Sequence, residues 1–184
     1  MADLPVLSTA RFTLRPLQRE DTGALFTTLG DPEQCRFLTR PAFGSESELW
    51  DWLADPSWPG QTWIAVDADG TVAGRFVAAP AHADDVFEIG YITLGSHQGQ
   101  RVASECAGAL IDHLFASPGG VSVRKITAEV DTRNTPSMRL LERLGFTREA
   151  TLREHEETHI GLCDVHWYGL LAREWNGGSA RRIA

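Results

Sequence analysis

The sequence predicts a single domain of mixed α and β structure, an α/β (α+β) fold. Its 184 residues are 42% hydrophobic and 23% charged, which is typical of one globular domain with a sizeable core. Glycine and proline separate short segments of helical or strand periodicity, and the chain holds no internal repeat. Early strands and helices are followed by a strand, a turn, a helix, a strand, a helix and a last pair of strands.

The first half of the chain is predicted to hold a strand, two helices and a β-hairpin. The hairpin is expected because Asp69-Gly70, a pair typical of a type I′ turn, separates two runs of strand-forming residues. In order, the elements are a strand over Arg11–Leu17, helices over Glu20–Leu29 and Glu46–Leu53, and strands over Trp63–Val66 and Val72–Ala78.

The second half is predicted to hold four strands and two helices. A helix from Ala103 has apolar residues at three- and four-residue spacing, and Pro118-Gly119-Gly120 ends it. A second helix begins at Thr135-Pro136 and ends before Gly145. The strands are Val86–Leu94, Lys125–Val130, Phe146–Arg153 and Asp164–Arg173, so that residues 1–175 form the domain and 176–184 a flexible tail.

Charge and cysteine content exclude several classes of protein. The net charge of −8 argues against nucleic acid as a partner and favours a cationic one. Cys35, Cys106 and Cys163 are odd in number and far apart, which favours buried free thiols over disulfides. No apolar run is long enough to span a membrane, so we expect a cytoplasmic protein without membrane association, either a monomer or a homodimer.

The turn Gln98–Ala103 is the first candidate for a binding site. It joins the strand Val86–Leu94 to the helix from Ala103. A turn at a helix N-terminus points unpaired backbone N–H groups and the positive end of the helix dipole at an anion. The turn therefore predicts a cofactor that carries a pyrophosphate.

Three segments together resemble the GCN5-related N-acetyltransferases, and within them the RimJ/RimL-type branch. They are Glu88–Leu94, Gln98–Glu105 and Asn134–Phe146, and the likeness extends from Leu7–Pro16 to Trp175. The resemblance implies one domain with a mixed central sheet, a splayed pair of strands and helices on both faces. It also implies acetyl-CoA as the cofactor and direct transfer of an acetyl group to an amine.

The resemblance also implies which residues bind the cofactor. The family's Q/R-x-x-G-x-G/A turn falls on Gln98–Ala103, with Arg101 in place of a glycine. A positive φ at this position would strain the arginine, although its guanidinium is able to contact a phosphate. The cofactor-binding residues so implied are Ile92, Thr93, Leu94, Gln98, Gly99, Gln100, Arg101, Val102, Ala103, Ser104 and Asn134.

Glu88 and Ser137 are the candidate catalytic residues. Amine attack on a thioester requires a proton acceptor and a means of protonating the departing thiolate. Glu88 lies on the strand face opposite Phe87, Ile89 and Tyr91, so it is either the base or a structural carboxylate. By resemblance, the Ser137 hydroxyl lies near the CoA sulfur; otherwise Asn134 or Thr135 caps the helix and Ser137 is a residue of its first turn.

The acceptor is less well defined by the sequence. Carboxylates and imidazoles over Arg153–His159, together with Asp164, suit a cationic amine, while a solvated hairpin tip explains the same charges. Asp164 and Trp50 are the candidate acceptor-binding residues, and no metal site is expected because His155 and His159 lack a third ligand. The acceptor is then a small cationic amine such as an aminoglycoside-type antibiotic, with resistance as its consequence, or a protein N-terminus.

Two other functions compete with the enzyme. A catalytically degenerate member of the family would bind CoA or a protein partner without turnover, with Arg101 as the sign of lost activity. A nucleotide-binding or phosphotransfer enzyme is disfavoured because the sequence contains neither G-x-x-x-x-G-K-[ST] nor G-x-G-x-x-G.

Overall fold

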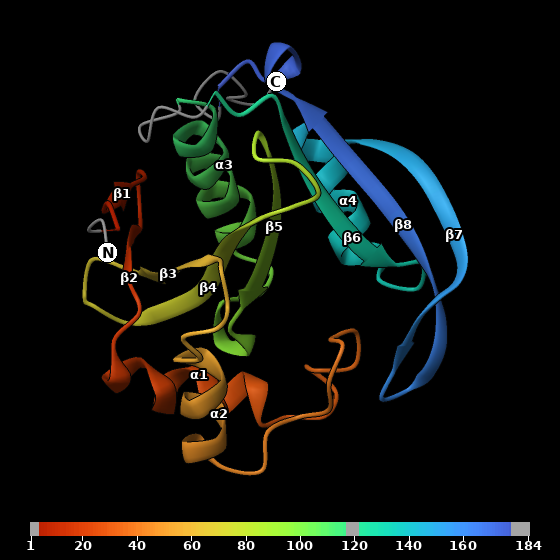
Figure 1. Ribbon diagram of the computed structural model, residues 1–184. Coiled ribbons are helices and arrows are strands. Elements are labelled where there is room, and N and C mark those ends of the chain that lie inside the picture. The colour runs from red at the N-terminus through yellow and green to blue at the C-terminus, as the bar shows by residue number, and fades with distance from the viewer. Residues whose placement is uncertain (1–3, 117–121, 178–184) are drawn as a thin grey trace.

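The computed structural model describes residues 4–116 and 122–177, and these residues form one eight-stranded mixed sheet with four α-helices (Figure 1). The strand order is β1-β2-β3-β4-β5-β6-β8-β7. The strands are β1 Leu7–Ser8, β2 Thr13–Pro16, β3 Gln61–Val66, β4 Val72–Pro80, β5 Val86–Thr93, β6 Lys125–Asp131, β7 Thr147–Thr158 and β8 Gly161–Leu171. The mixed sheet of the predicted fold class is thereby confirmed.

The antiparallel half of the sheet runs from β1 to β5. β3 and β4 form the predicted hairpin, but the type I′ turn is wrong, because Gly70 has φ 81° while Asp69 is not at positive φ. The turn is closed by the Gly70 N–H, which donates to the Asp67 carbonyl at 3.1 Å, and by the Asp67 N–H, which donates to Thr71 at 3.0 Å. One residue in the left-handed region therefore suffices for this loop.

The two halves of the sheet meet at β5 and β6, which pair in parallel over only three positions, from Val86↔Lys125 to Glu88↔Thr127. Beyond these positions the strands separate, and Figure 1 shows them diverging. β6 continues into an antiparallel ladder with β8, and β8 pairs with β7. The predicted splayed strand pair is thus present, and the gap that it leaves interrupts the sheet near its centre.

Helices cover both faces of the sheet, as predicted. α3 (Val102–Phe115) and α4 (Thr135–Leu144) pack on one face over a core that includes Trp63, Phe76 and Tyr168. α1 (Thr22–Leu29) and α2 (Glu46–Leu53) pack on the other face over a second core, which contains Leu49 and Ile64. The two cores therefore lie on opposite faces of the sheet.

Several predicted element bounds need correction. The segment predicted as one helix over Glu20–Leu29 is a short 3-10 turn, Arg19–Asp21, followed by α1. The last two strands are longer than predicted, and their bounds are shifted. Most of Arg153–His159 is therefore strand rather than hairpin tip, because β7 extends to Thr158. The helix breaker Pro118-Gly119-Gly120 and most of the predicted tail, residues 178–184, lie outside the described residues. In the described ranges, no helix has the length and apolar character to cross a membrane.

Each cysteine is buried and unpaired, as predicted. Burial raises the pKa of the Cys106 thiol to about 12, with the charge of Glu105 as a smaller cause. A thiol with such a pKa stays protonated at neutral pH and is a poor nucleophile. Cys106 is therefore part of the packing between α3 and the sheet.

Candidate functional site

The gap between β5 and β6 exposes main-chain groups of β5 that have no partner on β6. The Leu94 N–H donates to the Ala73 carbonyl of β4 at 3.0 Å, so alternate residues back along β5 also direct their main chain toward β4. The intervening residues Tyr91 and Thr93 direct theirs toward the gap. This edge is able to pair with an extended ligand as another strand would.

The register corrects one sequence-based assignment. Of Ile92, Thr93 and Leu94, only Thr93 turns its main chain toward the gap. The Leu94 carbonyl accepts the His97 N–H at 2.8 Å, and the Ile92 carbonyl faces Gly74 of β4. Tyr91, rather than Ile92, directs its main chain toward the gap, because neighbouring residues of a strand direct their main chains to opposite sides.

The turn after β5 forms an anion cradle at the start of α3. The first intrahelical bond runs from the Glu105 N–H to the Arg101 carbonyl at 3.1 Å. The N–H groups of Val102, Ala103 and Ser104 therefore have no intrahelical acceptor. Gly99 has φ 75°, and a Cβ placed there would meet no atom within 4 Å, so the turn is open to its surroundings at this residue. This fits a bound pyrophosphate.

Arg101 adopts the strained conformation anticipated from the sequence. It is the N-cap of α3, with φ 63° and ψ 16°, in the left-handed region that glycine prefers. For a residue with a Cβ this conformation costs about 1–2 kcal/mol. The turn thus has at Arg101 a backbone conformation typical of glycine, and the arginine is exposed at the N-terminus of α3.

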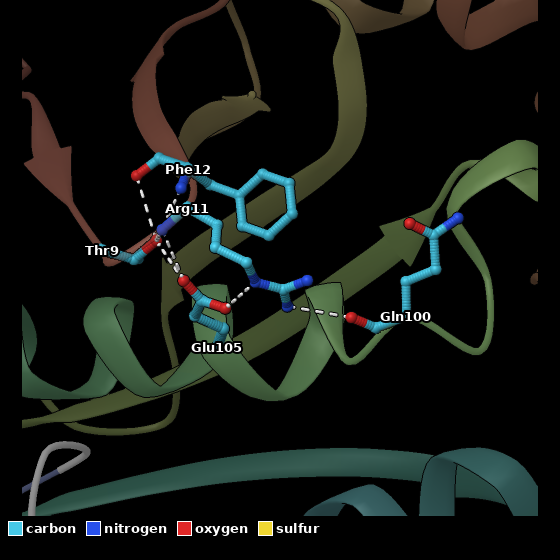
Figure 2. A network of polar contacts seen from close by, with 5 residues as sticks. All are labelled: Thr9, Arg11, Phe12, Gln100 and Glu105. Carbon is cyan, nitrogen blue, oxygen red and sulfur yellow. Dashed lines mark hydrogen bonds and ion pairs between the residues drawn. The ribbon is translucent and has the colours of Figure 1, made fainter. Parts of the chain in front are cut away.

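A polar network ties the cradle to the N-terminal strands (Figure 2). Glu105, in the first turn of α3, accepts from the Thr9 hydroxyl at 2.7 Å and from Arg11 Nε at 2.8 Å. Arg11 also donates to the Gln100 carbonyl at 2.9 Å. Burial raises the pKa of Glu105, but the hydrogen bonds from Thr9 and Arg11 outweigh this and leave it below its ordinary value. The carboxylate is therefore neutralised locally rather than facing an incoming phosphate.

The side chains of the two glutamines in the turn hydrogen-bond to other parts of the protein and hold the backbone of the turn in place. Gln98 Nε2 donates to Gln34 Oε1 at 2.7 Å, and Gln100 Nε2 donates to the Ser96 carbonyl at 3.0 Å. Both bonds remain within the protein. The side chains of Gln98 and Gln100 thus fix the backbone conformation of the turn, and any contribution of these residues to cofactor binding comes through that backbone.

Tyr91 and Ser137 meet across the gap. Tyr91 Oη lies 2.7 Å from Ser137 Oγ, and the Ser137 N–H donates to the capping Asn134 Oδ1 at 3.3 Å. Burial raises the pKa of Tyr91 to about 12, partly offset by the hydrogen bond with Ser137. Both hydroxyls therefore remain protonated at neutral pH. They form a pair of donors beside the exposed main chain of β5.

Glu88 lies on the opposite face of β5 from Tyr91, as expected from strand alternation. It lines a cavity of about 140 Å³ together with Glu129 of β6 and Glu156 of β7. Loss of hydration raises the pKa of Glu88 first, and the charges of Glu129 and Glu156 raise it further. A carboxylate with a raised pKa is a better proton acceptor near neutral pH.

A larger cavity of about 240 Å³ adjoins this one and shares Phe37, Thr39, Glu129 and Val130 with it. It is lined by the segment 37–40 after α1, by Tyr91 on β5, and by Asn134 and Ser137 at the start of α4. The two cavities therefore lie side by side at the open end of the gap, and together they are called the recess below. This recess is the space available to an acceptor.

The two acceptor-binding residues proposed from sequence lie elsewhere. Trp50 is packed beside Arg19, whose guanidinium carbon is 5.2 Å from the ring, and Trp52 lines the larger cavity instead. Asp164 accepts the Glu154 N–H at 2.8 Å, at a bulge where Glu154 has φ 48°. Neither Trp50 nor Asp164 lines the recess.

Sequence reasoning missed three residues of the recess. Tyr91 was noted only as a neighbour of Glu88, and Glu129 and Arg75 were not singled out. The available signals were weak: Tyr91 is the single tyrosine of its strand, and Arg75 is a charge within an otherwise apolar strand. Their positions depend on how β4, β5 and β6 pair, which local patterns do not reveal.

The fold and site together define a class of protein, the acyl-CoA-dependent acyltransferases. A splayed parallel strand pair offers main chain for an extended arm, and the adjoining cradle offers N–H groups for a pyrophosphate. Residues 11–147 match the family model of the acetyltransferase (GNAT) domain. The chain therefore belongs to the GCN5-related N-acetyltransferases and is an N-acetyltransferase that uses acetyl-CoA.

Individual relatives agree with this assignment. The chain is 32% identical to an uncharacterized N-acetyltransferase, p20, of Bacillus licheniformis, over 95% of this chain and 100% of that protein. Its fold is similar to that of a crystallised putative acetyltransferase from T. thermophilus, with a TM-score of 0.81, 30% identity, and coverage of 98% and 97% of the two chains. It is also similar in fold to spermidine N-acetyltransferase from Vibrio cholerae in complex with CoA and spermine, with a TM-score of 0.76 and 21% identity over 89% of this chain and 96% of that one.

Proposed function

We propose that this enzyme transfers an acetyl group directly from acetyl-CoA to a primary amine on a small molecule. The observation that carries the proposal is the recess itself. It has hydroxyl donors, Tyr91 and Ser137, on one side of β5 and the carboxylates Glu88 and Glu129 on the other. Donors and acceptors of protons thus lie on opposite faces of one strand, at the point where the sheet opens.

The acetyl donor supplies an activated thioester. The N–H groups of Val102, Ala103 and Ser104 bind its pyrophosphate, and the main chain of Tyr91 and Thr93 pairs with its pantetheine arm beside Asn134. A main-chain N–H of β5 that faces the gap would stabilise the oxyanion that forms when the amine attacks the thioester. These assignments follow from main-chain groups of β5 that have no partner on β6 and from N–H groups of α3 that have no intrahelical acceptor; the Thr93 carbonyl also accepts from Gln98 Nε2 at 3.4 Å.

Glu88 acts as the proton acceptor in this proposal. Alkyl amines are protonated at neutral pH, with reference pKa values near ~10, so the acceptor must lose a proton before it attacks. The raised pKa of Glu88 suits this role, and the charges of Glu129 and Glu156 draw the ammonium form into the recess. On the other face, the Tyr91–Ser137 pair would hydrogen-bond to the departing sulfur of bound acetyl-CoA and supply its proton.

A small acceptor fits better than a protein N-terminus. The two cavities hold about 240 and 140 Å³, and residues 37–40, Phe43 and Trp52 line the larger one. The spermidine N-acetyltransferase of Vibrio cholerae, a fold neighbour, supports a small amine. The RimJ/RimL-type branch has support from one neighbour, Mycobacterium smegmatis RimJ in complex with CoA-disulfide, which is 20% identical with a TM-score of 0.82.

Two measurements test the proposal. Acetyl-CoA at one hundred times its dissociation constant should stabilise the protein by about 2.7 kcal/mol in a thermal-shift titration. A panel of primary amines and peptides with free N-termini, followed by thiol release, should then give turnover with small amines. Stabilisation without turnover on any amine would favour the degenerate, non-catalytic alternative, and turnover only on peptides would favour a protein N-terminus.

A further inference from the structure

A buried arginine in the recess has no anionic partner among the residues that the structure describes. Arg75 lies in the middle of β4, opposite Ile64 on β3 and Ile92 on β5, and is 8% exposed. Its Nε is buried and has no hydrogen-bond partner within residues 4–116 and 122–177. Leaving a buried donor unsatisfied on a charged group costs more than leaving a neutral one. Such a group in an otherwise well-packed sheet needs an explanation.

The surroundings of Arg75 support its position without neutralising its charge. The guanidinium carbon lies 4.8 Å from the Trp52 ring and 5.6 Å from the Trp58 ring, and one terminal nitrogen donates to the Thr62 hydroxyl at 3.4 Å. Burial lowers the pKa of Arg75 to about 10, and no carboxylate of the described ranges opposes this shift. Arg75 is therefore still charged at neutral pH.

Arg75 lines the larger cavity, on the same face of the sheet as Glu88. Arg40, at the rim of this cavity, also bears a positive charge, but it is paired with Glu48 at 2.6 Å. Glu88 lines the adjoining smaller cavity, and Glu129 lines both. The recess is thus cationic at one end and acidic at the other.

The spacing of the two ends limits the ligand. Arg75 pairs with Ile92, and Gly90, two residues back along β5, lies where the strand opens. Two residues of a strand span about 7 Å. An amine held near Gly90 and an anionic group near Arg75 therefore lie within the length of one small molecule that carries both groups.

We propose that the acceptor carries an oxyanion, a carboxylate or phosphonate, and that Arg75 binds it and thereby determines specificity. The inference rests on the proposed function, because it names the class of amine that the same recess accepts. The guanidinium offers paired N–H donors to two oxygens of such a group. A polycation that lacks an anionic group would place positive charge against Arg75 and bind poorly.

The first test compares acceptors that differ only in the anionic group. A panel of α-, β- and γ-amino acids and aminoalkyl phosphonates is assayed with acetyl-CoA, each amino acid beside its own amide. We expect kcat/KM to be at least about tenfold higher for the acid than for the amide of the best acceptor. The amide has the less basic amine and hence more free base at neutral pH, so amine reactivity alone would favour the amide.

The second test uses Arg75→Met, which keeps the length of the side chain and removes its charge and donors. The variant should lose the preference for the acid, so that the ratio of kcat/KM for the acid to kcat/KM for the amide falls to about one. Its Tm without ligand should be unchanged or higher, because an unsatisfied buried charge has been removed. Arg19→Met is the matched control, since Arg19 also stacks on a tryptophan of α2, at 5.2 Å from Trp50, but lies outside the recess.

A structural role for Arg75 predicts the opposite pattern. A large fall in the Tm of Arg75→Met with the acid preference retained, or a wild-type enzyme that uses amides and plain amines as well as acids, would overturn the proposal and leave the N-acetyltransferase function intact. If Arg75→Met does not fold, the preference for the acid over the amide is compared between the wild type and Arg75→Lys instead. If no amine is turned over, the proposed function fails, and thermal shifts of the wild-type protein with CoA and each acid or amide still show whether the recess selects an anion.

Discussion

Tyr91 Oη lies 2.7 Å from Ser137 Oγ, which joins β5 to the first turn of α4 across the gap where β5 and β6 separate. Two elements far apart in sequence thus present two hydroxyls at one point. A serine alone is a weak proton donor to a thiolate. Its partner Tyr91 is buried and protonated, and the hydrogen bond between the two hydroxyls opposes the rise of the Tyr91 pKa that burial causes, so the serine keeps the tyrosine a stronger acid than burial alone would leave it.

Tyr91→Phe should lower kcat by about 100-fold, within the range for loss of a general acid. The KM for acetyl-CoA should change little, because the main chain of Tyr91 is kept. Ser137→Ala should give a similar or smaller loss, and the double variant should be no worse than the poorer single variant, since the two hydroxyls act as a unit. Steady-state kinetics with varied acetyl-CoA measure both parameters.

Additive losses in the double variant would contradict a shared role. So would an equal loss of kcat and of acetyl-CoA affinity in Tyr91→Phe, which would mean that the hydroxyl serves binding only. Tyr168→Phe is a suitable control. That hydroxyl donates to Glu142 at 3.3 Å, and Tyr168 does not line the recess.

Glu129→Gln should shift the acid limb of the kcat/KM profile to lower pH. Glu88 accepts a proton only when it is ionised, so activity rises as pH increases through its pKa. Burial and then the charges of Glu129 and Glu156 hold this pKa above its ordinary value of 4.5. Removing one neighbouring negative charge makes ionisation of Glu88 easier and lowers the pKa.

Glu88→Gln should remove this limb altogether, leaving a slow reaction that rises only where the amine deprotonates unaided. Glu157→Gln provides the control for a lost charge, because Glu157 lies on β7 but does not line either cavity. An unchanged profile in Glu88→Gln would exclude Glu88 as the base.

Glu105→Gln should lower the free energy of unfolding by about 1 kcal/mol at pH 7, because hydrogen bonds to a charged group are lost. The folded-state pKa of Glu105 lies below 4.5, since bonds from Thr9 and Arg11 outweigh burial. A depressed carboxyl pKa stabilises the fold above the unfolded-state pKa, and this contribution disappears as pH falls through the folded value. Urea denaturation from pH 7 to pH 3 should show the wild type and the variant converging, and a gap that persists at pH 3 would contradict the assignment.

Arg101→Gly and Arg101→Val should differ in stability. Glycine removes the strain at φ 63° and should keep the cradle, whereas a β-branched residue at this φ should destabilise the protein by about 1 kcal/mol or more. Denaturation and acetyl-CoA titration measure the two effects. If Arg101→Gly also loses affinity, the guanidinium contacts a phosphate; equal stability of the two variants would contradict the strain argument.

Features encoded in short stretches of sequence could be predicted. The second predicted helix agrees with α2, Glu46–Leu53, because Ser45 caps it, and Asn134 caps α4 as one of the two expected caps. The orientation of Glu88 followed from strand alternation. For Arg101, the sequence indicated only that a positive φ would strain the residue, and the structure shows φ 63°.

Features that depend on strand register could not. Which of Ile92, Thr93 and Leu94 turns its main chain to the gap is decided by the pairing with β4, through bonds such as Leu94 N–H to Ala73. Arg75 joins the recess because β4 lies beside β5 and α2 brings Trp52 over it. No local periodicity reports such a contact.

The central claim is that the gap beside β5 and the cradle before α3 form the cofactor site. Hydrogen–deuterium exchange with and without CoA tests it most directly. We predict slower exchange at the N–H groups of Tyr91 and of Val102, Ala103 and Ser104 when CoA is bound, with the β7–β8 hairpin near Thr158 unchanged. Slower exchange elsewhere with these four amides unaffected would contradict it.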